Sequence, residues 1–146
     1  MKNRNLDHKD DWKTPEKFYK ILDNIFKFDF DPCPFQNDIE KFDGLKVEWG
    51  KSNYVNPPYS SKLKTAFVKK AIEEYKNGKL CVLLLPVSTS TKLFHDLIIP
   101  CCPDIAFIKG RISFEGYNSK GEYVTNKKCM HDSFLIILDP KKLIKT

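Results

Sequence analysis

One stretch decides the fold of this 146-residue chain: Leu80-Cys81-Val82-Leu83-Leu84-Leu85, an unbroken apolar run that Pro86 closes. A short run of this kind is typical of a central strand in a parallel sheet, because both faces of such a strand are covered. The residues before it, 61–77, carry apolar side chains at helical spacing and are followed by Gly78. They predict an amphipathic helix that ends at this glycine.

Further helices and strands alternate on both sides of this core. Thr14 and Pro15 predict a helix start, with Thr14 as N-cap and Pro15 at the first helical position, followed by apolar residues at helical spacing up to Phe26. We expect residues 35–51 to be irregular. A short helix is expected over residues 91–99, and strands over residues 28–31, 52–55, 105–108, 112–114, 123–124 and 133–138. This alternation favours an α/β layer fold.

The composition is that of one globular domain, with 41% hydrophobic and 30% charged residues. We expect a flexible arm over residues 1–11 and a single domain over residues 12–146. No apolar run is long enough to span a membrane, and the first residues do not resemble a signal peptide. The net charge of +6 favours a polyanionic partner, although simple solubility is the alternative explanation.

Cysteine usage indicates a reduced, cytoplasmic setting. The chain has five cysteines, an odd number without Cys-x-x-Cys spacing. His95 lies near Cys101 and Cys102, but the spacing is not that of a zinc site, so no metal is expected.

The strongest candidate for chemistry is Asn56-Pro57-Pro58-Tyr59, which follows the expected strand 52–55. The carboxyl end of a strand is where open α/β sheets bind ligands. The Asn56 side-chain oxygen and the Pro57 carbonyl can each accept one N–H of an amine on a flat conjugated ring. The two prolines stiffen the turn, and Tyr59 offers a ring for stacking. The pattern therefore predicts methylation of such an amine, whereas the simpler alternative is a structural Asn-Pro turn.

Taken together, these motifs resemble the phage-type Dam DNA N6-adenine methyltransferases over residues 12–137. The resemblance rests on Trp12-x-Thr14-Pro15, Phe28-x-Phe30-Asp31-Pro32-Cys33 with Asn37, Asp43-Gly44-Leu45 with Trp49, Asn56-Pro57-Pro58-Tyr59-Ser60, Leu84-Leu85-Pro86 and Gly110-Arg111-Ile112-Ser113-Phe114.

The resemblance implies a minimal Rossmann-like methyltransferase sheet with helices on both faces, S-adenosylmethionine as cofactor and adenine in DNA as substrate. It implies catalytic roles for Asn56, Pro57, Pro58 and Tyr59. The cofactor residues that it implies are Thr14, Pro15, Asp31, Pro32, Cys33, Asn37 and Asp43. Of these, Asp31 can pair with an ammonium group and Thr14 can bond a carboxylate. A turn-forming role is the alternative for Asp31 before Pro32 and for Asp43 before Gly44. Protection of phage DNA from restriction is one biological role that the resemblance implies.

DNA contacts must come from loops, because so short a chain shows no separate recognition domain. The candidates are Lys62, Lys64, Lys109, Arg111, Lys127 and Lys128. Each could equally be an ordinary surface charge. A monomer or a homodimer is compatible with the sequence.

The chain departs from the family in one respect: its cofactor loop, residues 31–37, contains no glycine, although backbone groups in such loops usually approach the ligand closely. This keeps open a degenerate relative that binds DNA without methylating it. A second alternative is methylation of glutamine amides in proteins, since an amide nitrogen poses the same electronic problem.

Overall fold

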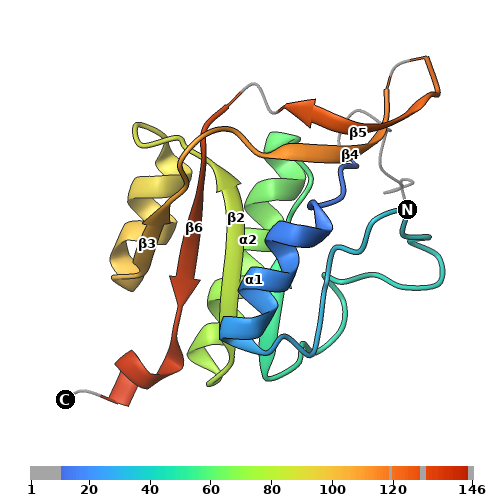
Figure 1. The fold of residues 1–146 in the computed structure, drawn as a ribbon. Helices are drawn as coiled ribbons and strands as arrows, with labels where there is room; N and C mark the ends of the chain where they lie inside the picture. The colour runs from blue at the N-terminus through green and yellow to red at the C-terminus, as the bar shows by residue number, and fades with distance from the viewer. Residues whose placement is uncertain (1–10, 119, 129–130, 145–146) are drawn as a thin grey trace.

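The computed structural model describes residues 11–118, 120–128 and 131–144, with the backbone alone at residues 126–128 and 144. Its centre is a four-stranded sheet of order β1-β2-β6-β3 (Figure 1). The strands are β1 (Ser52–Val55), β2 (Leu80–Pro86), β6 (Ser133–Leu138) and β3 (Asp104–Phe107). β1 and β2 are parallel, whereas β6 is antiparallel to both of its neighbours. The predicted α/β layer fold is confirmed, although the central strand β2 is parallel on one side only.

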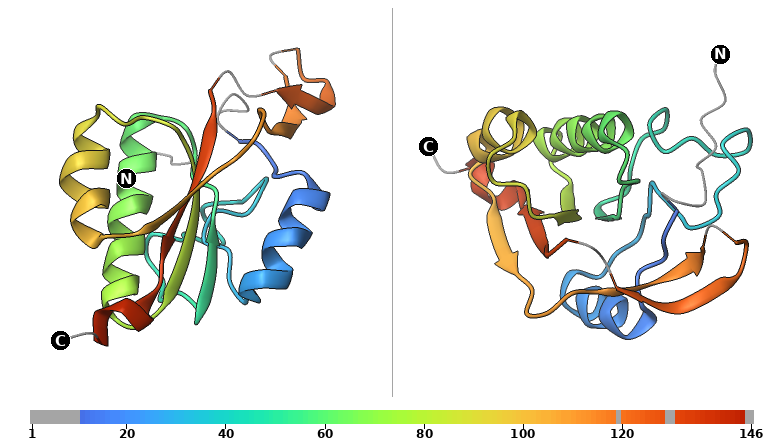
Figure 2. Two further views of the ribbon diagram at one scale, coloured as in Figure 1. Left: turned by 60° about the vertical axis from the view of Figure 1, so that its left-hand side comes forward. Right: turned by 90° about the horizontal axis from the view of Figure 1, so that it is seen from above.

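The apolar run of β2 is continuous because helices cover both faces of the sheet. Side chains alternate along a strand, so Cys81, Leu83 and Leu85 enter one core while Val82 and Leu84 enter the other. The first core is closed by α2 (Ser61–Lys76) and η1 (Leu93–Ile98), which lie side by side on one face. α1 (Glu16–Phe26) covers the opposite face (Figure 2).

The predicted helices are confirmed with adjusted bounds. α2 ends before Gly78, whose φ of +91° is the left-handed conformation that favours glycine. The helix expected over residues 91–99 is a six-residue π-helix, η1, followed by a short 3₁₀ turn, η2 (Ile99–Cys101). A second 3₁₀ turn, η3 (Pro140–Ile144), follows β6.

The predicted start of α1 is wrong by one residue. Pro15 occupies the N-cap position instead of Thr14, and its side chain makes no capping hydrogen bond. The reason is that the Thr14 hydroxyl is 2.6 Å from the Tyr54 hydroxyl, with which it shares a hydrogen bond. A helix start and a contact with the sheet compete for the same oxygen, and the sheet contact prevails.

The strand expected over residues 28–31 is reduced to a single parallel bridge between Phe30 and Asn53. The Asp29 carboxylate accepts hydrogen bonds from the backbone nitrogens of Ser52, at 3.0 Å, and Lys51, at 3.4 Å. Pro32 then supplies no N–H to continue the ladder. This segment still lies beside β1, which brings the loop after it next to Asn56.

A two-stranded hairpin of β4 (Ser113–Tyr117) and β5 (Tyr123–Lys128) stands apart from the sheet, as the two short strands predicted there indicate. The N-terminal segment pairs with its edge, since Lys13 and Glu115 exchange backbone hydrogen bonds of 2.7 and 3.0 Å. Gly116 is required here, because a Cβ at this position would lie 2.7 Å from the Trp12 ring. The hairpin therefore holds residues 12–14 in place.

A buried ionic cluster surrounds Glu74 of α2, near the amino ends of β1 and β2. Glu74 is 3% exposed. It accepts hydrogen bonds from the Trp49 backbone nitrogen at 3.1 Å and pairs with Lys70 at 3.0 Å and Lys79 at 2.8 Å. Burial would raise the pKa of Glu74, but the hydrogen bonds from Lys79, Lys70 and Trp49 outweigh it and lower that pKa.

Candidate active site

The Asn56-Pro57-Pro58-Tyr59 turn joins the carboxyl end of β1 to the start of α2, as the sequence predicts. Pro57 and Pro58 are buried, whereas Asn56 and Tyr59 are half-buried. The prolines have fixed φ and lie against the core, so the turn holds the Asn56 side chain on a rigid base.

The amide of Asn56 is oriented by the N-terminal segment. Its Nδ2 donates to the Trp12 carbonyl at 2.9 Å and to the Thr14 hydroxyl at 3.4 Å. A carbonyl oxygen can only accept, so the amide nitrogen must face Trp12. Oδ1 accepts no hydrogen bond from the described residues, which leaves it available to a ligand.

Tyr54 holds the Thr14 hydroxyl that contacts the Asn56 amide. Its ring is 2% exposed, and its hydroxyl shares the 2.6 Å hydrogen bond with Thr14. Burial raises the pKa of Tyr54, so the phenol remains neutral. The hydroxyls of Tyr54 and Thr14 and the amide of Asn56 thus form one chain of hydrogen bonds that ends at the candidate catalytic residue.

The loop after Phe30 presents the partly buried carboxylate of Asp31. Asp31 Oδ1 accepts a 2.8 Å hydrogen bond from the Cys33 backbone nitrogen, and no described Lys, Arg or His pairs with this carboxylate. Burial raises the pKa of Asp31 to about 6. The turn-forming role and the predicted ligand-binding role are compatible, because only one carboxylate oxygen is used in the turn.

The candidate cofactor loop has no glycine of its own, but Gly44 packs closely against its backbone. A Cβ at Gly44 would lie 1.9 Å from the Pro32 carbonyl oxygen. The Trp49 indole nitrogen donates to the Gly44 carbonyl at 2.7 Å. Gly44 therefore allows residues 31–34 to pack closely, and Trp49 fixes the position of Gly44.

Two pockets meet at Asn56. The first is walled by the apolar side chains of Ile39, Leu63 and Phe67. Its other lining residues are Asp11, Trp12, Pro32, Cys33, Pro34, Asn37, Gly44, Asn56 and Pro58. The second pocket is lined by Trp12, Lys13, Thr14, Glu16, Tyr19, Asp31, Cys33, Pro34, Phe35, Tyr54 and Asn56. The two pockets share four lining residues, Trp12, Cys33, Pro34 and Asn56; Asp31 lines the second pocket, and the apolar wall belongs to the first.

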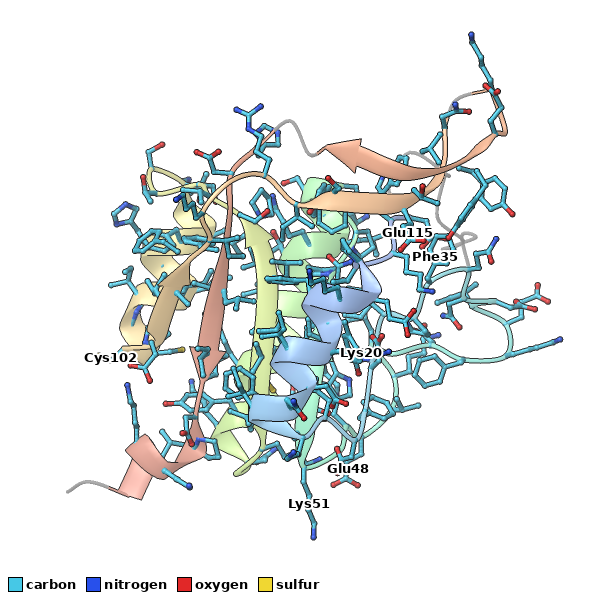
Figure 3. The ribbon with its side chains drawn as sticks, viewed as in Figure 1. Lys20, Phe35, Glu48, Lys51, Cys102 and Glu115 are labelled. Atoms are coloured by element: carbon cyan, nitrogen blue, oxygen red, sulfur yellow. The ribbon has the colours of Figure 1, made fainter. Side chains whose placement is uncertain are left out.

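Tyr59 faces the hairpin. Its ring makes an edge-to-face contact with Phe114 of β4, with 6.0 Å between ring centroids. On the other side of the hairpin, the Tyr123 ring lies 6.4 Å from Phe35 of the Asp31 loop. Figure 3 shows Phe35 and Glu115 close together at this end of the molecule. The hairpin thus contacts both the candidate catalytic turn and the candidate cofactor loop.

The remaining predicted cofactor residues fall in different places. Asn37 lines the first pocket and donates to the Phe42 carbonyl at 2.8 Å. Asp43 is not among the residues that line the two pockets; it accepts from the Leu45 backbone nitrogen at 3.0 Å within a turn. Pro15 likewise lies outside the lining. The geometry of Asp43 thus matches the turn alternative.

The predicted DNA-contacting residues come from several parts of the chain. Lys62 and Lys64 lie in the first turn of α2. Lys109 is exposed, and Arg111 pairs with Asp132 at 3.4 Å. Lys127 and Lys128 lie in β5, but their side chains are outside the described part of the chain, as is the predicted arm up to residue 10.

Several site residues were not predicted from the sequence. The Trp12 carbonyl is a backbone group without a sequence signature, and Tyr54 reads as an ordinary strand residue. Ile39, Leu63 and Phe67 read as packing positions. The apolar spacing of α2 could have indicated that its first turns line a pocket next to Asn56.

Two further features, a metal site and a membrane-spanning helix, are absent from the part of the chain that the structure describes. Within residues 11–118, 120–128 and 131–144, no three His, Cys, Asp or Glu side chains gather to hold a metal ion. In the same residues, no helix has the length and apolarity that crossing a membrane demands.

Comparison with known proteins agrees with this geometry. The family model for DNA N-6-adenine-methyltransferase (Dam) matches residues 2–144. The DNA N-6-adenine-methyltransferase of Escherichia phage T1 is 36% identical over 98 residues, which are 60% of this chain and 40% of that relative. The chain thus spans about 40% of the length of the curated relative it matches. No solved structure matches. The chain belongs to the Dam family of DNA N-6-adenine-methyltransferases.

Proposed function

We propose that this protein transfers a methyl group from S-adenosylmethionine to the exocyclic N6 of adenine in DNA. The proposal rests on the orientation of the Asn56 amide. Its nitrogen is tethered to Trp12 and Thr14, and its oxygen is left as an acceptor where two pockets meet. An amine drawn against this oxygen would lie beside the pocket that holds Asp31.

The residues of the two pockets fit S-adenosylmethionine. Asp31 is a partly buried carboxylate without a described cationic partner, which suits an ammonium group. The apolar wall of Ile39, Leu63 and Phe67 suits a purine ring. Thr14 also lines the second pocket, and its hydroxyl can donate to a carboxylate. The cofactor supplies a methyl group that its sulfonium centre already activates.

The residues of the chain would then supply orientation and charge stabilisation. Asn56 Oδ1 and the Pro57 carbonyl accept the two N–H groups of the adenine amine, which directs the nitrogen lone pair toward the methyl group. Tyr59, three residues after Asn56, would stack on the base, which must leave the DNA stack to reach Asn56. Transfer of the methyl group from sulfur to nitrogen would place positive charge on the nitrogen, where Asn56 Oδ1 and the Pro57 carbonyl would stabilise it. The methylated nitrogen then loses one proton to water.

The sheet supports the finer description of a minimal Rossmann-like methyltransferase. β1, α2 and β2 form a parallel strand–helix–strand unit, and the candidate site lies at the carboxyl end of β1. Phe30 adds a parallel bridge beside β1, so the Asp31 loop also opens at this edge. The protein would act as a monomer or homodimer in the cytoplasm of a bacterial or phage-infected cell.

Methyl transfer with purified protein tests the proposal. The protein is incubated with labelled S-adenosylmethionine and either DNA or a mixture of proteins, and nucleosides are then analysed by mass spectrometry. We expect N6-methyladenine from the wild type. Asn56→Ala should transfer about a hundredfold more slowly, the scale of losing one preorganised charge-stabilising contact. Calorimetric titration should show that this variant still binds the cofactor.

Each alternative gives a different result. Label in glutamine residues instead of DNA would identify a protein amide methyltransferase. DNA binding without cofactor binding would identify a degenerate relative. Near-normal turnover of Asn56→Ala would remove Asn56 from the mechanism.

A further inference from the structure

A polar groove runs between α2 and η1, on the face of the sheet opposite α1 (Figure 2). Three lysines line it: Lys64, Lys69 and Lys92. Hydroxyl groups come from Ser61 and Thr65 of α2 and from Ser88 and Thr91, which precede η1. We refer to this region as the α2–η1 groove.

The groove carries more positive than negative charge. Asp96 is the one carboxylate among its lining residues, against three lysines. Within the described part of the chain, none of these lysines forms an ion pair. Lys70 provides a contrast, because it is next to Lys69 in sequence but points to the other side of α2, where it pairs with buried Glu74 at 3.0 Å. The helix thus separates one lysine that is part of the core from another that faces the groove.

The groove opens at the same edge of the sheet as the candidate active site. β1 and β2 are parallel, so their carboxyl ends share one edge, where Asn56 follows β1 and Ser88 follows β2. Ser61 is the first residue of α2 and lies two residues beyond Tyr59. From Ser61 to Lys69 the helix rises about 12 Å. At about 3.4 Å of rise per nucleotide, this length accommodates roughly three nucleotides of one strand.

The groove wall is held in a defined shape. The Thr91 hydroxyl donates to the Ser88 carbonyl at 3.0 Å. It also accepts from the Phe94 backbone nitrogen at 3.3 Å. The His95 ring lies 2.6 Å from the Thr89 carbonyl. The loop that carries Ser88 and Lys92 is therefore tied to η1 before any ligand arrives.

We infer that the α2–η1 groove binds the sugar–phosphate backbone of the DNA strand next to the adenine in the active site. Lysine ammonium groups and serine or threonine hydroxyls bind phosphates, fixing the register of the DNA without reading its bases. Backbone contact at this edge of the sheet would hold the strand while its target base occupies the active site. The inference rests on the proposed function, and it adds Lys69 and Lys92 to the DNA contacts that the sequence predicts.

Salt dependence of DNA binding tests the inference. Affinity for a fluorescein-labelled DNA duplex is measured by anisotropy over a series of salt concentrations. Replacing Lys64, Lys69 and Lys92 together by Gln should flatten the slope of log affinity against log salt by about 2 to 3, because each phosphate contact contributes roughly −0.9. The matched control replaces Lys27, Lys51 and Lys76 by Gln. They flank the amino ends of β1 and β2, and Figure 3 shows Lys51 at the end opposite Glu115.

The control triple variant loses the same charge but should keep the wild-type slope. Thermal unfolding of both variants checks that they are folded. Equal slopes for the groove variant and the wild type, or equal flattening in the two variants, would overturn the inference. Wild-type protein that does not bind DNA would overturn it as well.

Methyl transfer by the wild type, measured in parallel, separates the two proposals. Groove-dependent DNA binding without methyl transfer refutes the proposed function and supports the groove. Methyl transfer to DNA with an unchanged slope in the groove variant refutes the groove and supports the function.

Discussion

Asp31→Asn should make the free protein more stable and bind its proposed cofactor less tightly. Burial raises the pKa of Asp31 from its ordinary value of 3.8 to about 6. The folded chain therefore holds this proton more tightly than the unfolded chain does. The charged carboxylate costs stability above pH 6, and the cost disappears as the pH falls below 3.8. At about 1.36 kcal/mol per pKa unit, the cost reaches about 3 kcal/mol at neutral pH.

Asn suits this test because it retains the local hydrogen bond. Its Oδ1 can still accept from the Cys33 backbone nitrogen, which lies 2.8 Å from the Asp31 oxygen. The free energy of unfolding is measured with urea at several pH values for both proteins. The free energy of unfolding of the variant should exceed that of the wild type by up to about 3 kcal/mol near pH 7.5 and by almost nothing near pH 3.5. Groups that titrate alike in both proteins do not contribute to this difference. Asp38→Asn, at an exposed position of the same region, controls for the loss of a charge.

Calorimetric titration with S-adenosylmethionine gives the second measurement. A hydrogen bond to a charged group contributes about 1.5 to 3 kcal/mol, so Asp31→Asn should weaken binding by roughly tenfold to a hundredfold near neutral pH. Wild-type affinity should also fall as the pH drops below 6, where the free carboxylate gains a proton. A stability difference that does not change with pH would refute the burial of a charged Asp31. Unchanged cofactor affinity would place the ammonium group elsewhere.

Three further predictions concern residues around this site and the core. Tyr59→Phe should keep most activity, whereas Tyr59→Ala should lose roughly 1–3 kcal/mol of stacking energy in single-turnover assays; equal damage from both would implicate the hydroxyl. Tyr54→Phe removes the 2.6 Å contact with Thr14, so we expect the rate of methyl transfer to fall by about tenfold while cofactor affinity stays constant, and a parallel loss of affinity would indicate a merely structural role. Glu74→Ala should lower the free energy of unfolding by about 3 kcal/mol in urea titrations at neutral pH, because it leaves partly buried Lys70 without its ion-pair partner, leaves Lys79 only the exposed carboxylate of Glu48, and removes the acceptor of the Trp49 backbone nitrogen. Since the pKa of Glu74 is lowered, the difference should shrink as the pH falls below 4.5, and a constant difference would contradict this account.

Much of the architecture follows from local sequence patterns. The run 80–85 identified the central strand, because only burial on both faces accommodates six consecutive apolar side chains. The spacing in residues 61–77 identified α2, and Gly78 marked its end. The candidate turn Asn56-Pro57-Pro58-Tyr59 could be singled out because its four residues are consecutive, so that no tertiary contact is needed to see them together.

Some predictions failed where two uses of one group competed. Thr14 is a suitable helix cap by type, but Tyr54, forty positions further along the chain, takes its hydroxyl. Residues 28–31 alternate like a strand, yet Asp29 binds the backbone of Ser52 and leaves a single bridge. Local patterns cannot show which of two partners prevails, because that depends on the distances set by the folded chain.

The sequence by itself determined the helix and sheet layers and most of the strands, and it singled out the candidate site residues. Only the tertiary structure decided how those residues are held. The Trp12 carbonyl that orients Asn56 is a backbone group, which every residue type possesses. The groove joins Lys64 and Lys69 to Lys92 across two elements, and no spacing along the chain relates them. Hydrogen bonds and electrostatic fields act over a few ångströms of space, so residues distant in sequence become a site only when the sheet brings them together.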